Sequence, residues 1–286
     1  MTTSIQPLSR ILRVNDLDLH YLEWGAADAP PIVCVHGYTG SADAFNALAR
    51  HLQDRFHIFA LDVRGHGESA WSPSGAYRYE DQAGDLGGFV GGLGLDKFVL
   101  IGTSMGGIIA MTHVAECPDR LSGLVINDIG PEAEAGTQRI TQMVGSRPDE
   151  FASLDEAMAY RRSASPILAA RSAEDQHELA LGVLRQRADG KWRWKMDPAY
   201  IRQRVEHGPP ARPLLWPVLQ ALGCPTLVVW GTESDVLSEA QALRMVDVLP
   251  RGELVRVPGI GHAPTLVEPV VLAALDRFLG GLSAQH

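Results

Sequence analysis

The stretch LIGTSMGGIIAM, residues 100–111, places a short polar run between two apolar ones. One apolar run ends at Ile101 and the next follows almost at once, so a strand and a helix must be joined by a tight turn around Ser104. Gly102 and Gly106 complete a Gly-x-Ser-x-Gly pattern, and neither has a Cβ atom to collide with the neighbouring strand or helix. We expect the turn to hold the serine in a strained backbone conformation, with its hydroxyl raised above a sheet edge.

Ser104 in this position suits a nucleophile, because the turn presents its hydroxyl at the start of a helix. The alternative is a helix cap, which the flanking apolar strand and helix make the less favoured interpretation. A serine hydroxyl reacts poorly at neutral pH and needs a basic partner. We expect that base to be His262, in the glycine- and proline-containing stretch VPGIGHAPTLVEP after the last apolar run.

A carboxylate at a neighbouring strand end would orient the imidazole and stabilise its protonated form. Asp235, in VVWGTESDVLS, follows an apolar strand and gives the chain order Ser, Asp, His. Asp128, at the end of LVIND, is the alternative acid, and Glu233 also lies near. Asp235 is favoured, and Asp128 is expected to hydrogen-bond loop backbone.

Two backbone amides are candidates for stabilising an oxyanion, as acyl transfer requires. The stretch VCVHGYTGS turns the chain so that the amide of Tyr38 can face the pocket beside the amide of Met105. His36 is expected to bond this loop or to line the substrate pocket. In LDVRGHGES, a metal site built on Asp62 and His66 lacks further ligands at a convincing spacing, so a structural loop is expected.

Short uninterrupted apolar runs recur along the chain, as is typical of strands buried on both faces of a parallel sheet. They are residues 32–35, 56–61, 98–101, 121–126, 226–230 and 254–257. Segments with helical spacing lie among them, at residues 41–52, 105–115, 240–248 and 267–279. Residues 10–14 and 19–24 flank Asn15-Asp16 and indicate an antiparallel hairpin at one edge. The alternation predicts a doubly wound α/β sheet.

The alternation of strands and helices stops near the middle of the chain and resumes in its last quarter. The intervening part reads as helical and polar, and it carries about half of the basic residues. We therefore divide the chain into a core of residues 1–131 and 213–286 and an inserted helical subdomain of residues 132–212.

Side chains in and beside the insertion are candidates for the substrate pocket. Trp192 and Trp194 alternate, so only one of them is expected to face the pocket, and Trp216 lies where the chain returns to the core. Four arginines are positioned either to meet a substrate carboxylate or to form a solvated face: Arg161, Arg162, Arg185 and Arg187.

The composition is that of a globular protein, with 286 residues, 45% hydrophobic and 21% charged. A formal net charge of −9 and the lack of a basic block argue against nucleic-acid binding. The opening residues do not resemble a targeting peptide, and no run approaches the roughly 20 apolar residues of a membrane span. We expect a cytoplasmic protein without membrane contact, whose Cys34, Cys117 and Cys224 are unpaired.

Taken together, the motifs resemble the α/β-hydrolase fold family, because HGYTG, DVRGHGES, GTSMGG, WGTESD and GIGHAPTLVEP occur in that family's order. The resemblance implies an eight-stranded, mostly parallel sheet and a helical lid after the sixth strand. It also implies a triad of Ser104, Asp235 and His262, with the Tyr38 and Met105 amides as the oxyanion hole.

The resemblance further implies a serine hydrolase that cleaves a small carboxylic ester or lactone through an acyl-enzyme. The SMGG elbow and the compact lid look most similar to those of small carboxylesterases and enol-lactonases. Ser104 stands where epoxide hydrolases and haloalkane dehalogenases carry aspartate, and Ala263 stands where C–C hydrolases often carry tryptophan. No cofactor or metal is implied, and a monomer or homodimer is expected. Alternatives are a C–C bond hydrolase or perhydrolase with the same triad, and, from another class, a hydrolase-like ligand receptor with little turnover.

Overall fold

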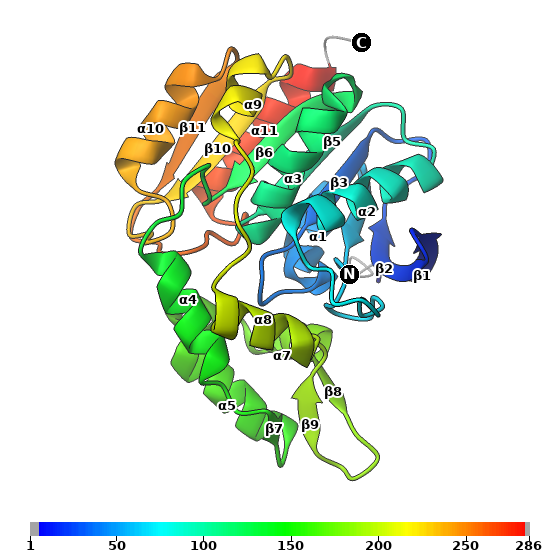
Figure 1. Ribbon diagram of the computed structural model, residues 1–286. Coiled ribbons are helices and arrows are strands. Elements are labelled where there is room, and N and C mark those ends of the chain that lie inside the picture. The colour runs from blue at the N-terminus through cyan, green and yellow to red at the C-terminus, as the bar shows by residue number, and fades with distance from the viewer. Residues whose placement is uncertain (1–5, 284–286) are drawn as a thin grey trace.

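A single mixed sheet forms the centre of the computed structural model, which describes residues 6–283 (Figure 1). The strand order is β1-β2-β4-β3-β5-β6-β10-β11, with β1 and β4 antiparallel to β2 and the other neighbours parallel. The eight-stranded, mostly parallel sheet is therefore confirmed. Residues 1–5, on which the expected lack of a targeting peptide partly depends, lie outside the described residues. The strands are β1 Leu8–Val14, β2 Leu17–Trp24, β3 Pro31–Val35, β4 His57–Leu61, β5 Phe98–Thr103, β6 Leu121–Asn127, β10 Thr226–Gly231 and β11 Gly252–Val257.

The strands fall on the apolar runs because both faces of the sheet are covered by helices. Every residue of β4 is buried, as the uninterrupted pattern predicts. The hairpin of β1 and β2 turns at Asn15 and Asp16, whose φ angles of 48° and 62° are ones that Asn and Asp tolerate better than other non-glycine residues. The edge hairpin is thus confirmed.

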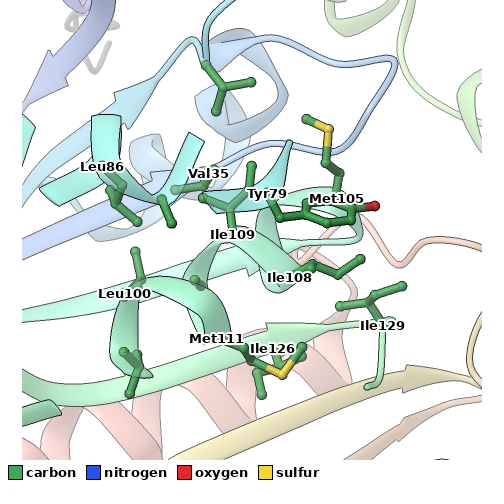
Figure 2. Packing of buried hydrophobic residues seen from close by; sticks show 14 of the residues in the cluster. Val35, Tyr79, Leu86, Leu100, Met105, Ile108, Ile109, Met111, Ile126 and Ile129 are labelled. Atoms are coloured by element: carbon green, nitrogen blue, oxygen red, sulfur yellow. The ribbon is translucent and has the colours of Figure 1, made fainter. Parts of the chain in front are cut away.

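Two apolar clusters hold helices on opposite faces of the sheet. One cluster joins side chains of α2, α3, α9 and α10, and the other joins those of η1, α1 and α11. Figure 2 shows the first cluster, in which Ile108 and Ile109 of α3 pack among side chains that include Ile126 and Ile129. The helices are η1 Ala42–Phe45, α1 Asn46–Leu52, α2 Tyr79–Gly92, α3 Met105–Glu116, η2 Pro118–Arg120, α9 Trp216–Ala221, α10 Glu239–Val248 and α11 Pro269–Ser283.

Helix α2 is absent from the sequence predictions because its many glycines lower helix propensity. The structure gives these glycines a packing role. A Cβ at Gly88 would lie 2.4 Å from Cγ1 of Val14, and one at Gly92 would lie 2.9 Å from Cδ2 of Leu12. The glycines therefore let α2 approach the β1–β2 hairpin closely.

The chain between β6 and α9 forms a separate group of elements, drawn at one side of the sheet in Figure 1. Besides helices it contains a three-stranded antiparallel sheet in the order β7-β9-β8, which the sequence predictions do not include because each strand has only two or three residues. The elements are α4 Gly136–Gly145, β7 Glu150–Phe151, α5 Leu154–Ala164, α6 Pro166–Ala169, α7 Ala173–Val183, β8 Leu184–Gln186, β9 Trp192–Trp194 and α8 Pro198–His207.

Tyr200 fastens helix α8 to the core. Its ring stacks on Tyr77 with centroids 4.4 Å apart and meets the edge of Tyr38 at 5.0 Å. Its hydroxyl accepts a hydrogen bond from Gln82 Nε2 at 3.2 Å and lies 3.4 Å from the sulfur of Met105. One residue of the insertion thus contacts both residues whose amides are expected to bind an oxyanion.

Within residues 6–283, no helix is long and apolar enough to cross a membrane. Cys34, Cys117 and Cys224 are free thiols.

Candidate active site

Ser104 occupies the turn between β5 and α3, with φ 53° and ψ −118°. The neighbouring glycines are sterically required: a Cβ at Gly102 would lie 2.5 Å from the carbonyl oxygen of Gly106, and a Cβ at Gly106 would lie 2.1 Å from that of Val35. Both distances are far below van der Waals contact. Close packing of β5, α3 and β3 therefore forces the strained backbone conformation at the serine.

His262 lies between Ser104 and a carboxylate. Its Nε2 is 2.8 Å from the Ser104 hydroxyl, and its Nδ1 is 2.8 Å from Oδ2 of Asp128. The imidazole is only 9% exposed and the Asp128 side chain is fully buried. The three groups form an unbroken chain of hydrogen bonds across residues far apart in the sequence.

Asp128 is held by donors from the strand beside it. Its Oδ1 accepts from the Gly231 amide at 3.0 Å, and its Oδ2 accepts from the Ser234 hydroxyl at 2.7 Å. The residue follows β6 directly with φ 56°. Because β6 and β10 are neighbours in the sheet, the end of β10 and the loop after it supply the donors that orient this buried carboxylate.

The prediction that Asp235 orients His262 is wrong in this structure. The Asp235 side chain, 40% exposed, instead forms a bidentate ion pair with Arg139, whose Nη2 lies 2.8 Å from Oδ1. That guanidinium holds the pKa of Asp235 below its usual value. Glu233, the other nearby acid, is exposed. The position beside the imidazole belongs to Asp128, the alternative considered from the sequence.

Asn127 and Ser234 also shape the site, and the sequence analysis does not single them out. The Asn127 side chain donates to the Pro264 carbonyl at 2.9 Å and so ties the end of β6 to the loop that carries His262. The backbone carbonyl of Asn127 accepts from the Ser104 amide at 2.9 Å. The polar residue at the end of LVIND, directly before Asp128, is the sequence signal that could have identified Asn127.

The loop after β3 passes directly beside the serine. A Cβ at Gly37 would lie 3.3 Å from Cβ of Ser104. The next peptide in the chain, that of Tyr38, therefore lies close to the serine. His66 lies with Nε2 2.7 Å from the Tyr38 carbonyl and fixes that peptide. Burial lowers the pKa of His66 to about 3, so the imidazole is neutral. Met105 opens α3, where an amide has no carbonyl partner within the helix.

His36 holds two loops together and lies outside the cavity. It is fully buried, with Nδ1 2.8 Å from the Gly37 carbonyl, and its Nε2 accepts from the Val63 amide at 3.2 Å. Burial lowers its pKa. The expectation that it bonds the loop is therefore met, whereas its assignment to the substrate pocket is wrong.

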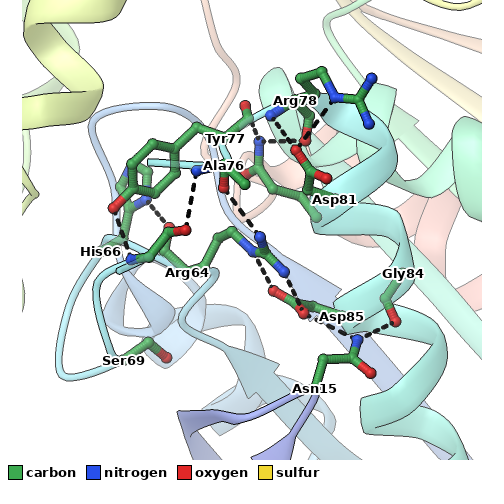
Figure 3. A network of polar contacts seen from close by, with 12 residues as sticks. Asn15, Arg64, His66, Ser69, Ala76, Tyr77, Arg78, Asp81, Gly84 and Asp85 are labelled. Carbon is green, nitrogen blue, oxygen red and sulfur yellow. Dashed lines mark hydrogen bonds and ion pairs between the residues drawn. The ribbon is translucent and has the colours of Figure 1, made fainter. Parts of the chain in front are cut away.

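The stretch at residues 61–69 forms a loop fixed by polar contacts, part of which Figure 3 shows. Arg64 forms a bidentate ion pair with Asp85 of α2, with nitrogen–oxygen distances of 2.5 and 2.7 Å. Asp62 accepts from the amides of Ala42 and Glu68 and lies 2.7 Å from His20 Nδ1. Through these contacts, residues 61–69 hold together the loops around the site.

A cavity of about 340 Å³ opens from the Ser104 hydroxyl and His262. Its walls come from the loops after β3 and β11 on the core side and from α4, α5 and α6 on the other. Of the tryptophans predicted for the pocket, Trp194 lines the cavity. Trp192 packs in the small cluster of the insertion, and Trp216 donates to Glu132 beside Arg244, so neither belongs to the cavity. Of the four arginines considered, only Arg161 lines it.

The comparisons with known proteins identify the family. Residues 30–269 match the model of the α/β hydrolase fold, and the chain belongs to that family. It is 31% identical over 271 residues to the 3-hydroxybutyrate-oligomer hydrolase of Cupriavidus necator, covering 91% of this chain and 92% of the relative. It is 28% identical over 253 residues to the esterase YbfF of Escherichia coli, covering 87% and 92%.

Solved structures agree with this assignment. The crystal structure of an α/β hydrolase from Novosphingobium aromaticivorans superposes with a TM-score of 0.85 at 31% identity, covering 96% of this chain and 98% of the other. That of E-2-(acetamidomethylene)succinate hydrolase has a TM-score of 0.85 at 27% identity, covering 96% and 99%. The family and its relatives make the protein a hydrolase.

Proposed function

We propose that the protein is a serine hydrolase that cleaves a small carboxylic ester or lactone through an acyl-enzyme intermediate. The observation that carries the proposal is the hydrogen-bonded series of Ser104, His262 and Asp128, with 2.8 Å at each link. The esterases and the 3-hydroxybutyrate-oligomer hydrolase among the relatives support an ester substrate.

In the proposed first half-reaction, the Ser104 oxygen attacks the ester carbonyl while His262 Nε2 takes the hydroxyl proton. The C–O bond to the alcohol then breaks, and the alcohol leaves with that proton. In the second half-reaction water gives a proton to Nε2 and attacks the acyl-enzyme, which releases the acid and restores Ser104. Asp128 holds the Nδ1–H tautomer and stabilises the imidazolium at both stages.

The oxyanion of each tetrahedral intermediate is assigned to the backbone amides of Tyr38 and Met105. Two features support this role: the loop of Tyr38 runs beside the serine, and the Met105 amide opens a helix whose dipole favours negative charge. His66 acts through the Tyr38 carbonyl as a positioning residue. Residues 132–212 are proposed to serve as a lid, because α4 to α6 supply one wall of the cavity.

The first experiment follows p-nitrophenol release from p-nitrophenyl esters of increasing acyl length over many turnovers. We expect sustained turnover by the wild-type protein and a loss of at least about 10³-fold in kcat for Ser104→Ala, because the nucleophile is removed while the oxyanion donors stay. Ser74→Ala is the matched control and should leave kcat within about threefold of wild type, since it removes an exposed serine hydroxyl outside the cavity.

Each alternative gives a different result in this assay. A single burst without turnover would indicate a hydrolase-like receptor, and activity that survives in Ser104→Ala would contradict the serine mechanism. Mass spectrometry of the products distinguishes an esterase from a C–C hydrolase or a perhydrolase, since only ester cleavage gives an acid and an alcohol from the same substrate.

A further inference from the structure

The cavity beside Ser104 is strongly cationic, in contrast to the chain as a whole. Among the described residues, four arginines and no aspartate or glutamate line it. The chain has a formal net charge of −9, so the excess of positive charge is local. The four residues are Arg139, Arg147, Arg161 and Arg171.

Among the described residues, only one of these arginines forms an ion pair with a carboxylate. Arg139 pairs with Asp235. Arg161 donates to the backbone carbonyl of Leu179 at 2.5 Å, and no ion pair within residues 6–283 involves Arg147 or Arg171. Burial lowers the pKa values of Arg147 and Arg161 to about 10, because both cations are kept from water, and the charge of Asp149 offsets this effect at Arg147 only in part.

Arg147 and Tyr38 both line this cavity, and each carries an unused hydrogen-bond donor. In the described part of the chain, Nη2 of Arg147 and the hydroxyl of Tyr38 are both buried and neither has a hydrogen-bond partner. The two groups are close enough to affect each other's pKa, and burial raises that of Tyr38, so its hydroxyl stays protonated. The Arg147 guanidinium is kept in place by stacking 4.3 Å above the Trp194 ring.

We infer that the cavity takes substrates that carry a carboxylate, bound by Arg147 and the Tyr38 hydroxyl with Arg161 nearby. A buried donor without a partner is costly, and a buried cation more so, unless a ligand supplies the missing acceptor. The two oxygens of a carboxylate can accept from two donors, one of them charged. The inference rests on the proposed function for its catalytic consequence, because the carboxylate then holds the ester at Ser104.

The catalytic test compares matched esters that differ only in charge. One series places the anion on the acyl side, in the monoethyl esters of adipic, pimelic and suberic acids. The other places it on the alcohol side, in butanoate esters of 4-hydroxybutanoic and 5-hydroxypentanoic acids. Each has a control in which a carboxamide replaces the carboxylate. We expect kcat/KM of the best anionic ester to exceed that of its carboxamide at least about tenfold, mainly through KM.

Variants locate the source of that preference. Arg147→Gln is expected to bring the ratio of anionic ester to carboxamide close to one, and Tyr38→Phe to lower it severalfold. Arg162→Gln is the matched control, because Arg162 is an exposed cation on α5 outside the cavity and its loss changes net charge equally. A preference that survives in Arg147→Gln, or that falls equally in Arg162→Gln, would overturn the inference.

A binding measurement separates this inference from the proposed function. Calorimetry on Ser104→Ala measures affinity for the intact anionic esters and their carboxamides without hydrolysis. We expect at least about tenfold tighter binding of the best anionic ester and loss of this difference in Ser104→Ala/Arg147→Gln. Equal affinities would disprove carboxylate recognition even if the enzyme is an esterase, whereas a large difference without turnover would disprove only the proposed chemistry.

Discussion

Asp128 and Asp235 both follow strands near His262, and their positions after those strands decide which of them reaches the imidazole. Both follow strands that are neighbours in the sheet, so spacing along the chain does not distinguish them. Asp128 comes directly after its strand, in a left-handed conformation, and accepts hydrogen bonds from the last residue of the neighbouring strand and from the loop after it. Asp235 lies farther along its loop, where Arg139 of the insertion binds it. That arginine is distant in sequence, so its contact could not be predicted.

Asparagine substitutions test this assignment. Asp128→Asn is expected to lower kcat for p-nitrophenyl esters by about 10⁴-fold, because an amide cannot hold the productive imidazole tautomer or stabilise its charge. Asp235→Asn is the matched control, with kcat within about threefold of wild type, since an exposed ion pair contributes only about 0–1 kcal/mol. The reverse order of effects would return the acid role to Asp235.

At the scale of elements, apolar runs and glycine positions predict most of the core. The predicted runs at residues 32–35, 98–101 and 226–230 all lie in observed strands, because continuous burial leaves little room for polar residues. Helix α2 is the exception. Its glycines lower helix propensity, but they allow the helix to pack closely against the β1–β2 hairpin. The small sheet of the insertion could not be predicted for a related reason: tertiary contacts outweigh local pattern in strands of two or three residues.

Tyr200 provides an element-scale prediction about how α8 is attached. Tyr200→Ala is expected to lower the free energy of unfolding by about 3–5 kcal/mol, because a large buried ring is lost from a packed aromatic cluster. It should also reduce kcat, since the ring touches Tyr38 and the hydroxyl touches Met105. Urea denaturation and ester turnover measure the two effects.

Val205→Ala is the control for Tyr200→Ala, because Val205 lies on the same helix with 51% of its surface exposed. It should change stability by less than about 0.5 kcal/mol and leave kcat unaltered. If Tyr200→Ala were as mild as this control, α8 would not depend on the ring for its attachment.

At the scale of the whole molecule, the substrate cavity is the part that the sequence predicts least. Ser104 and His262 have local signals, the glycines around each of them, so they could be proposed from short motifs. Tyr38 of the core and Arg147 of the insertion line the same cavity, and no local pattern relates residues so far apart. Among the four arginines considered from the sequence, only Arg161 lines the cavity within the described residues, because tertiary packing decides which side chains face inward.

Buried neutral histidines make the stability of the whole fold depend on pH. Burial lowers the pKa of His66 to about 3, and burial together with the charge of Arg120 lowers that of His113 to about 4. An unfolded histidine titrates near pH 6.5, so below that value the unfolded chain binds more protons than the folded chain. The stability from these groups is present above about pH 6.5 and is lost as pH falls, towards 4 for His113 and towards 3 for His66.

His113→Phe tests this account, because both ring nitrogens of His113 are buried without a hydrogen-bond partner in residues 6–283, and the ring lies near Phe98. Urea denaturation between pH 4.5 and 7.5 measures the free energy of unfolding of variant and wild type. The variant's free energy should fall less steeply with decreasing pH, because one proton fewer is taken up on unfolding. The difference, variant minus wild type, should therefore be about 2 kcal/mol more favourable to the variant at pH 5 than at pH 7.5. His177→Gln, which removes an exposed histidine, should leave the slope unchanged. An unaltered slope in His113→Phe would show that His113 is already protonated in the folded state, and the pH dependence would then have to come from the remaining buried groups.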